Sequence, residues 1–259
     1  EVNLLYVKGS GWDLEFIEAD GFAPVQLEYM QRLATLPTLS DPQMVNELVT
    51  HMTRATAPTP SVETILHALL PYAYVDHTHA DAVIAITNTA NGEVRIREIY
   101  GADVIVVPYV MPGFDLARRV AEIFAKESGP QTLGMVLLNH GIFSFGATAR
   151  EAYERMVALV SRAEDYLDRK GAWHLPPTSA ASEPKALREE IATLRKEVSA
   201  QLGAPAILAS DPAQKYLAFA RRADITTLGQ QGPATPDHVI RTKRLPMLGR
   251  DVAQYAAAY

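Results

Sequence analysis

Short apolar runs alternate with longer amphipathic stretches over residues 1–171. The short runs predict strands at 4–8, 83–87, 103–107, 133–138 and 142–145, and another strand-like run ends at His77-Thr78-His79. Apolar residues spaced by three and four predict helices at 45–53, 61–70 and 114–127. A capping box, Thr148-Ala149-Arg150-Glu151, opens a long helix that runs to about residue 170.

This alternation predicts an α/β fold in which helices cover both faces of a mixed central sheet, a three-layer α/β/α arrangement. Asn91-Gly92 is a turn signal, so we expect some neighbouring strands to be antiparallel. Thr59 and Pro60 predict the N-cap and the first position of the helix at 61–70.

The pattern changes after Lys170. Residues 173–184 are rich in Pro, Ser, Thr and Ala and predict a linker. Helices at 185–201 and from Ser210, with a short strand at 206–209, are expected to follow. We therefore divide the chain into a catalytic domain at 1–171 and a linker with a mostly helical extension at 172–259. Because Glu1 opens almost directly on a strand, we interpret the N-terminus as lying inside a larger domain.

The amino-acid composition argues against several classes of function. Of the 259 residues 48% are hydrophobic, enough for one large core, and the net charge of −6 leaves no basic stripe for nucleic acid or an anionic membrane. No apolar run approaches the roughly 20 residues of a membrane span. The sequence has no cysteine, so His, Asp or Glu must hold any transition metal, and a cytoplasmic location fits. It has no glycine-rich dinucleotide loop, so we expect no NAD binding.

Three histidines form the main candidate site. His77 and His79 are two residues apart, so a strand would direct both side chains to one face. His140 follows a second apolar run in Asn139-His140-Gly141. Three imidazoles with an open fourth position are the form of a catalytic metal site. The remaining candidates, His51, His174 and His238, are interpreted as structural.

Two other residues have more than one interpretation. Glu63 is either a carboxylate favoured by a helix N-terminus or a metal ligand and general base, and the residues alone leave these readings even. It shares a helix face with His67. Tyr100 could donate a proton, but the residues alone favour core packing.

Glycine and serine residues offer candidates for phosphate binding. Gly9-Ser10-Gly11 and Ser61 could present backbone N–H and hydroxyl groups to an anion. Turn formation and helix capping explain the same residues equally well.

Several short sequence motifs, taken in their order along the chain, resemble those of a known protein family. They are Lys8-Gly9-Ser10-Gly11, Pro60-Ser61-Val62-Glu63 with His67, His77-Thr78-His79, Ile99-Tyr100 and Asn139-His140-Gly141. Together they resemble the class II aldolase/adducin head family. Longer strings at 8–14, 75–81, 108–114, 140–146 and 232–246 resemble the aldolase half of bifunctional rhamnulose-1-phosphate aldolase/alcohol dehydrogenase proteins. In that group the tail leads into a short-chain dehydrogenase domain.

The resemblance implies roles for the site residues. His77, His79 and His140 would hold zinc or another divalent metal. Glu63 would contact the metal at rest and act as acid and base. Tyr100 matches a tyrosine that reaches a neighbouring subunit's site, which implies a homo-oligomer, and four-fold rings are common in the family.

It also implies a phosphorylated substrate. Ser10, Gly11 and Ser61 match phosphate-contacting positions, whereas the family's upstream Gly-Asn-x-Ser loop is not among these residues and Val62 replaces a second serine. The implied reaction is retro-aldol cleavage of a ketose 1-phosphate, such as rhamnulose 1-phosphate, to dihydroxyacetone phosphate and a hydroxyaldehyde such as L-lactaldehyde.

Other functions remain open. A sugar-phosphate epimerase or dehydratase could use the same site, and an adducin-like module would be non-catalytic. The full set of three histidines and a carboxylate favours an enzyme.

Overall fold

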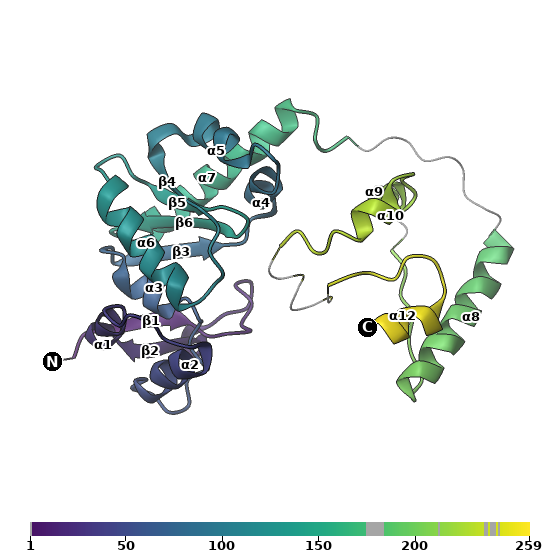
Figure 1. Ribbon diagram of the computed structural model, residues 1–259, viewed down its shortest axis with the longest axis horizontal. Coiled ribbons are helices and arrows are strands. Elements are labelled where there is room, and N and C mark those ends of the chain that lie inside the picture. Colours follow the sequence, from purple (N-terminus) through teal and green to yellow (C-terminus); the bar gives the residue numbers. More distant parts are fainter. Residues whose placement is uncertain (1, 175–183, 212, 236–237, 239–241, 243) are drawn as a thin grey trace. The chain divides into compact units, whose positions relative to one another are not determined.

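The computed structural model describes residues 2–174, 184–211, 213–235, 238, 242 and 244–259. The chain divides into two compact units, Glu1–Tyr166 and Leu167–Tyr259 (Figure 1). The expected strand at the N-terminus is present as β1 (Leu4–Lys8).

The first unit is built on a four-stranded sheet with the order β3-β6-β5-β4 (Figure 1). Its strands are β3 (Tyr74–Thr78), β4 (Val104–Val107), β5 (Gly134–Leu137) and β6 (Gly141–Gly146). β4 and β5 are parallel, whereas β6 is antiparallel to both β3 and β5. The prediction of a mixed central sheet is therefore confirmed.

Helices cover both faces of this sheet. On one face α3 (Thr64–Leu69) and α6 (Phe114–Glu127) pack their apolar residues against alternate strand residues such as Met135 and Phe143. On the other face α7 (Ala149–Arg169) contacts the sheet, and Ser144 Oγ of β6 donates a hydrogen bond to the Ala152 carbonyl of α7. Successive strand residues point to opposite faces, so both faces of the sheet are buried. The three-layer α/β/α prediction is confirmed.

A small antiparallel sheet lies beside this core. β1 pairs with β2 (Phe22–Gln26), and β2 runs directly into α1 (Leu27–Leu33). A single 3-10 turn, Ala19–Gly21, precedes β2. α2 (Asp41–Thr50) begins at a capping box formed by Ser40 and Gln43, earlier than the sequence pattern suggested.

The region after β3 differs from the prediction. Residues 83–87 belong to a helix, α4 (Asp81–Thr87). The Asn91-Gly92 signal lies at the start of another helix, α5 (Gly92–Tyr100), and a 3-10 turn, Gly101–Asp103, follows that helix. A short, β-branched run of this kind predicts a strand, but here it forms a helix that buries apolar side chains on several sides.

α3 is also shorter than predicted. Pro60 forms a bridge with Gly9, and the Ser61 N–H donates to the Lys8 carbonyl. These contacts hold the chain extended beside the end of β1, so the helix starts only at Thr64. Pro60 is therefore not a helix residue.

The second unit is helical. Its helices are α8 (Pro184–Leu202), α9 (Gln214–Ala220), α10 (Ile225–Gly229) and α12 (Val252–Ala258). The expected strand at 206–209 is not formed. Most of the expected linker at 173–184, and part of the tail at 232–246, lie outside the described residues. Among the described helices, none combines the length and apolar character needed to cross a membrane.

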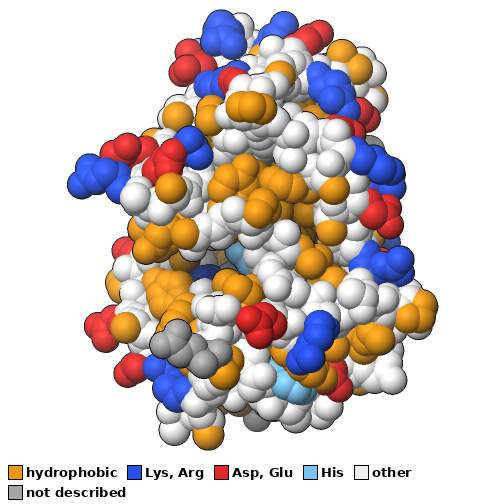
Figure 2. Space-filling view, turned by 90° about the vertical axis from the view of Figure 1, so that its left-hand side faces the viewer, with side chains coloured by type: hydrophobic (Ala, Val, Ile, Leu, Met, Phe, Trp, Pro, Cys, Tyr) orange, Lys and Arg blue, Asp and Glu red, His pale blue; other side chains and the backbone are white. Residues whose placement is uncertain are grey.

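Apolar side chains also reach the surface. On the face that Figure 2 shows, apolar side chains lie at several places among charged ones. In the first unit, exposed examples are Tyr6, Leu14, Phe16, Tyr109 and Met111.

Candidate metal centre

The sheet brings the three predicted histidines together. His77 lies in β3 and His79 just beyond its end, while His140 lies in the turn between β5 and β6. Because β3 pairs with β6, His77 is opposite Phe143, three residues after His140. One ligand atom from each histidine lies within 4.8 Å of the other two. A single metal ion with bonds of about 2 Å holds its ligand atoms at most about 4 Å apart, so an inward shift of these side chains would bring all three to one ion.

Glu63 joins the three imidazoles. It lies immediately before α3, where its side chain faces the end of the sheet. Its Oε2 is 3.4 Å from Nε2 of His77, and its Oε1 is 3.2 Å from Nε2 of His140. The side chains of Glu63, His77 and His140 are 11%, 9% and 3% exposed. A carboxylate and three imidazoles thus share one nearly buried cluster.

The donor atoms of this cluster fit a divalent cation. Nδ1 of His77 lies 3.0 Å from the Ile142 carbonyl oxygen, so it carries the proton and leaves the Nε2 lone pair facing Glu63. Among the described residues, Glu63 Oε1, His77 Nε2 and His140 Nδ1 are buried without a hydrogen-bond partner. Buried nitrogen and oxygen atoms gathered without partners in this way are the kind of donor set that a cation would satisfy. Nitrogen and oxygen ligands in this number suit zinc.

The electrostatics of the cluster agree with this chemistry. Burial lowers the pKa of His77 to about 3, more than the nearby Glu63 carboxylate raises it. Burial alone would raise the pKa of Glu63, but His77, His140 and His67 together hold it well below its ordinary value. At neutral pH the imidazole of His77 is therefore neutral and the carboxylate ionised, which are the forms that bind metal.

The backbone is packed closely around the histidines. A Cβ on Gly141 would lie 2.5 Å from the Thr78 carbonyl oxygen, 3.0 Å from Cε1 of His77 and 3.1 Å from Cδ2 of His79. The ring of His77 also stacks on Phe143, with centroids 4.0 Å apart. Only glycine leaves room for the two rings at position 141.

The predicted phosphate-contacting residues lie next to one another. The bridge between Gly9 and Pro60 sets Ser10 and Gly11 beside Ser61, two residues from Glu63. Their backbone N–H groups were expected to face an anion, but the Ser10 N–H donates to the Thr59 carbonyl and the Ser61 N–H to the Lys8 carbonyl. The main chain thus uses these two donors. Phosphate contact by Ser10, Gly11 and Ser61 stays a prediction.

Tyr100 is not placed to serve as a proton donor to a neighbouring subunit. It is 2% exposed, and its hydroxyl donates to the Leu159 carbonyl at 2.8 Å. Arg162 lies over its ring at 5.0 Å, and burial raises the pKa of the hydroxyl above its ordinary value. The structure thus favours core packing over the role that the resemblance implied.

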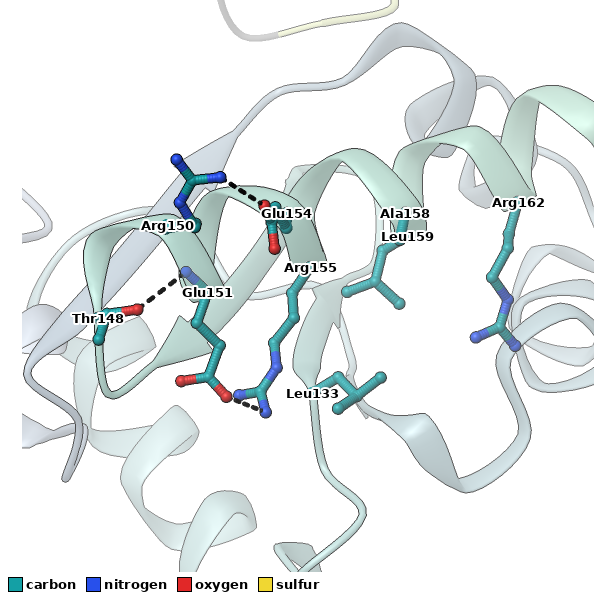
Figure 3. Close-up of a pocket in the computed structure, with 9 residues that line it drawn as sticks. All are labelled: Leu133, Thr148, Arg150, Glu151, Glu154, Arg155, Ala158, Leu159 and Arg162. Carbon is teal, nitrogen blue, oxygen red and sulfur yellow. Dashed lines mark hydrogen bonds and ion pairs between the residues drawn. The ribbon is translucent and has the colours of Figure 1, made fainter.

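A hollow of about 410 Å³ lies elsewhere, along α7 (Figure 3). Four of its charged side chains pair with one another, Arg150 with Glu154 and Arg155 with Glu151, and Arg162 pairs with Asp103. None of the four cluster residues lines it. We therefore place the chemistry at the histidines and not in this hollow.

Two family models match the sequence. The class II aldolase and adducin N-terminal domain matches residues 1–167, and the second domain of class II aldolases matches residues 185–258. These two matches together cover most of the chain.

Similar proteins include a longer relative and solved structures. Over 254 residues the chain is 33% identical to the uncharacterized oxidoreductase YuxG of Bacillus subtilis (strain 168), covering 95% of the chain but 36% of that protein. The chain thus spans about a third of that relative's length. The N-terminal class II aldolase domain of a conserved protein from Thermoplasma acidophilum is 40% identical with a TM-score of 0.59, over 64% of this chain and 76% of the other. An L-fuculose 1-phosphate aldolase is 16% identical with a TM-score of 0.44, over 73% and 80%.

Proposed function

Because the chain belongs to the class II aldolase and adducin N-terminal domain family, we propose that it catalyses metal-dependent retro-aldol cleavage of a ketose 1-phosphate. The products would be dihydroxyacetone phosphate and a hydroxyaldehyde, L-lactaldehyde if the substrate is rhamnulose 1-phosphate. The observation that carries the proposal is the buried Glu63 carboxylate facing His77 and His140, with His79 beside them.

We assign a role to each residue of the cluster. His77, His79 and His140 would hold the cation, zinc by preference. When bound, a divalent cation supplies Lewis-acid polarisation of a substrate carbonyl, worth several kcal/mol. Glu63 is the ionisable group that remains to exchange protons with the substrate.

The bond changes can be written in order. Glu63 accepts the proton of the hydroxyl at C4, that oxygen becomes the aldehyde oxygen, and the C3–C4 bond breaks. The electron pair stays with the three-carbon fragment as an enediolate. A proton delivered to C3 then completes dihydroxyacetone phosphate. A positioned general base of this kind contributes about 10²–10⁴-fold to the rate.

The contacts of Glu63 also set its strength as a base. Two of the imidazoles that lower its pKa, those of His77 and His140, face its carboxylate in the structure. A carboxylate held this way accepts protons weakly, and movement away from His77 and His140 would raise its pKa toward the range useful for catalysis. We propose that the arriving substrate causes this movement.

The phosphate end of the substrate is assigned to the neighbouring loop. Ser10, Gly11 and Ser61 lie together close to Glu63, with the two serine hydroxyls as donors. The Ser61 hydroxyl already accepts from the Glu63 N–H at 3.3 Å, so its own proton remains for an anion. This arrangement would set the phosphate and the reacting carbons at opposite ends of one site.

Product analysis tests the proposal. The zinc-loaded chain is incubated with rhamnulose 1-phosphate and with a panel of other ketose phosphates, and released dihydroxyacetone phosphate is measured by its enzymatic reduction. We expect release from at least one ketose 1-phosphate, with an equal amount of aldehyde. An epimerised or dehydrated product would instead assign the site to one of those reactions.

Two variants serve as controls for this assay. Glu63→Gln removes the base but keeps the three histidines, so we expect zinc to be retained and cleavage to fall about 10²–10⁴-fold. His77→Ala should lose both zinc and cleavage. Retained zinc and unchanged cleavage in His77→Ala would contradict the proposal, as would the absence of cleavage of every ketose phosphate by the zinc-loaded chain.

A further inference from the structure

The turn that carries His140 has an unusual backbone. β5 ends at Leu137 and β6 begins at Gly141, so only three residues connect the strands. The middle one, Asn139, has a φ of +60°, and no other non-glycine residue in the described part of the chain has a positive φ. The left-handed region disfavours side chains, although asparagine tolerates it better than most residues. A conformation of this kind persists only where surrounding contacts hold it.

Three hydrogen bonds hold Asn139 in place. Its backbone N–H donates to Thr87 Oγ1 at 3.2 Å, and its Nδ2 donates to Asn88 Oδ1 at 2.8 Å and to the Thr87 carbonyl at 3.4 Å. Thr87 is 5% exposed, and its hydroxyl proton goes to the Ile84 carbonyl at 3.1 Å. The hydroxyl oxygen is thereby oriented to accept from Asn139. We name these contacts between Asn139, Thr87 and Asn88 the turn clamp.

The turn clamp joins the two parts of the chain that supply the histidines. Thr87 is the last residue of α4, which begins at Asp81, two residues after His79. Asn139 immediately precedes His140. The clamp therefore joins parts of the chain about 50 residues apart in sequence. It fixes the turn that carries His140 to α4, the helix that follows His77 and His79.

We propose that Asn139 is a positioning residue for the metal site: through the turn clamp it sets the place of the His140 imidazole relative to His77 and His79. It does not contact the cation or the substrate. The side chain suits this role because it tolerates the left-handed backbone and donates two hydrogen bonds. This inference rests on the proposed function, since it concerns the same divalent cation.

Changes on the two sides of the clamp should have the same effect. Asn139→Gly keeps the positive φ but removes the side-chain donors. Thr87→Val keeps the size of the residue but removes the acceptor for the Asn139 N–H, whereas Thr87→Ser restores that acceptor. Thr89→Val is a matched control, because the Thr89 hydroxyl donates to the Ile86 carbonyl near the same helix end and is not one of the groups that hold Asn139.

The experiment uses Co²⁺ as the probe on the whole chain. Cobalt affinity is measured by competition with a chelator, the visible absorption spectrum of the cobalt protein reports ligand geometry, and thermal unfolding without metal reports folding. We expect Asn139→Gly and Thr87→Val each to weaken cobalt binding about 10–100-fold and to change the spectrum. Thr87→Ser and Thr89→Val should match the unmodified chain.

Opposite results separate this inference from the proposed function. If Asn139→Gly and Thr87→Val bind cobalt with unchanged affinity and spectrum, the positioning role is overturned and the metal site stands. If Thr87→Ser is as impaired as Thr87→Val, the hydroxyl is not the acting group and the clamp is likewise overturned. An unmodified chain that binds no cobalt overturns the proposed function together with this inference.

Discussion

At the scale of single residues, the site depends on charge states that burial creates. His77 is held neutral because a buried imidazolium loses its hydration, and Glu63 is held ionised because imidazoles surround it. Both effects oppose protonation, one at the His77 imidazole and the other at the Glu63 carboxylate. They keep the donor atoms ready for a cation at neutral pH.

These charge states predict that the metal-free protein loses stability in acid. An unfolded histidine takes up a proton near pH 6.5, whereas native His77 does so only near pH 3. Between these values the unfolded state binds more protons, so the free energy of unfolding falls as pH decreases, by at most about 1.4 kcal/mol per pH unit. Glu63 adds to the loss below its ordinary pKa. Urea unfolding of chelator-treated protein from pH 7.5 to 4.5 measures this slope.

The matched variant for this measurement is His77→Gln. It removes the titrating group and should show a shallower decline between pH 6.5 and 4.5 than the unmodified chain. Equal slopes for the two proteins would mean that His77 does not couple folding to protons.

Residue chemistry was the part of the site that the sequence predicted best. The spacing of His77 and His79, with His140 after a second apolar run, was enough to propose one metal site. Glu63 needed the resemblance as well, because its contact with the histidines depends on where α3 begins. The turn clamp was missed, although the order Asn139-His140-Gly141 contains a signal, an asparagine in a tight turn.

At the scale of elements, the close approach of β6 to the end of β3 holds the histidine rings. Gly141→Ala should therefore damage the site, since its Cβ would meet a backbone carbonyl and two imidazoles. We expect a loss of about 1–3 kcal/mol in the free energy of unfolding together with weaker metal binding. Gly129→Ala is the control, because its nearest neighbour is the flexible end of Gln131. Equal behaviour of the two variants in urea unfolding and zinc titration would contradict this account.

The contact between α5 and α7 gives a second prediction at this scale. Tyr100→Phe removes the hydrogen bond to the Leu159 carbonyl but keeps the packing, so stability should fall by about 1 kcal/mol while turnover per bound metal stays unchanged. Tyr153→Phe, on the exposed face of α7, should change neither. A loss of turnover in Tyr100→Phe without loss of stability would restore its catalytic role.

The elements show where sequence patterns stop being informative. β1 and α6 have the predicted bounds, because a strand that ends at a glycine turn and a long amphipathic helix each have one clear period. The sequence pattern missed α4 because residues 83–87 are a short apolar segment with no period to distinguish a helix from a strand, and it missed α5 because Asn91-Gly92 reads as a turn between strands. Tertiary packing on several sides decides such a segment, and a single sequence does not contain that information.

At the scale of the whole molecule, the site and the main core lie in one unit. The main hydrophobic cluster runs from Val25 to Phe145, and the three histidines and Glu63 lie in the same unit, Glu1–Tyr166. A chain of residues 1–174 should therefore fold and bind zinc with the affinity of the full 259 residues. Calorimetric titration and thermal unfolding of both chains measure this. A shorter chain that folds but no longer binds zinc would show that residues 175–259 contribute to the site.

The central claim is that His77, His79 and His140 hold one catalytic divalent cation beside Glu63. Diffraction from crystals of the zinc-loaded chain, with anomalous data on both sides of the zinc absorption edge, tests it most directly. The account predicts one anomalous peak about 2.0–2.1 Å from a nitrogen of each of the three histidines. A peak bound by fewer than these three imidazoles, or no peak among them in crystals grown with excess zinc, would contradict it.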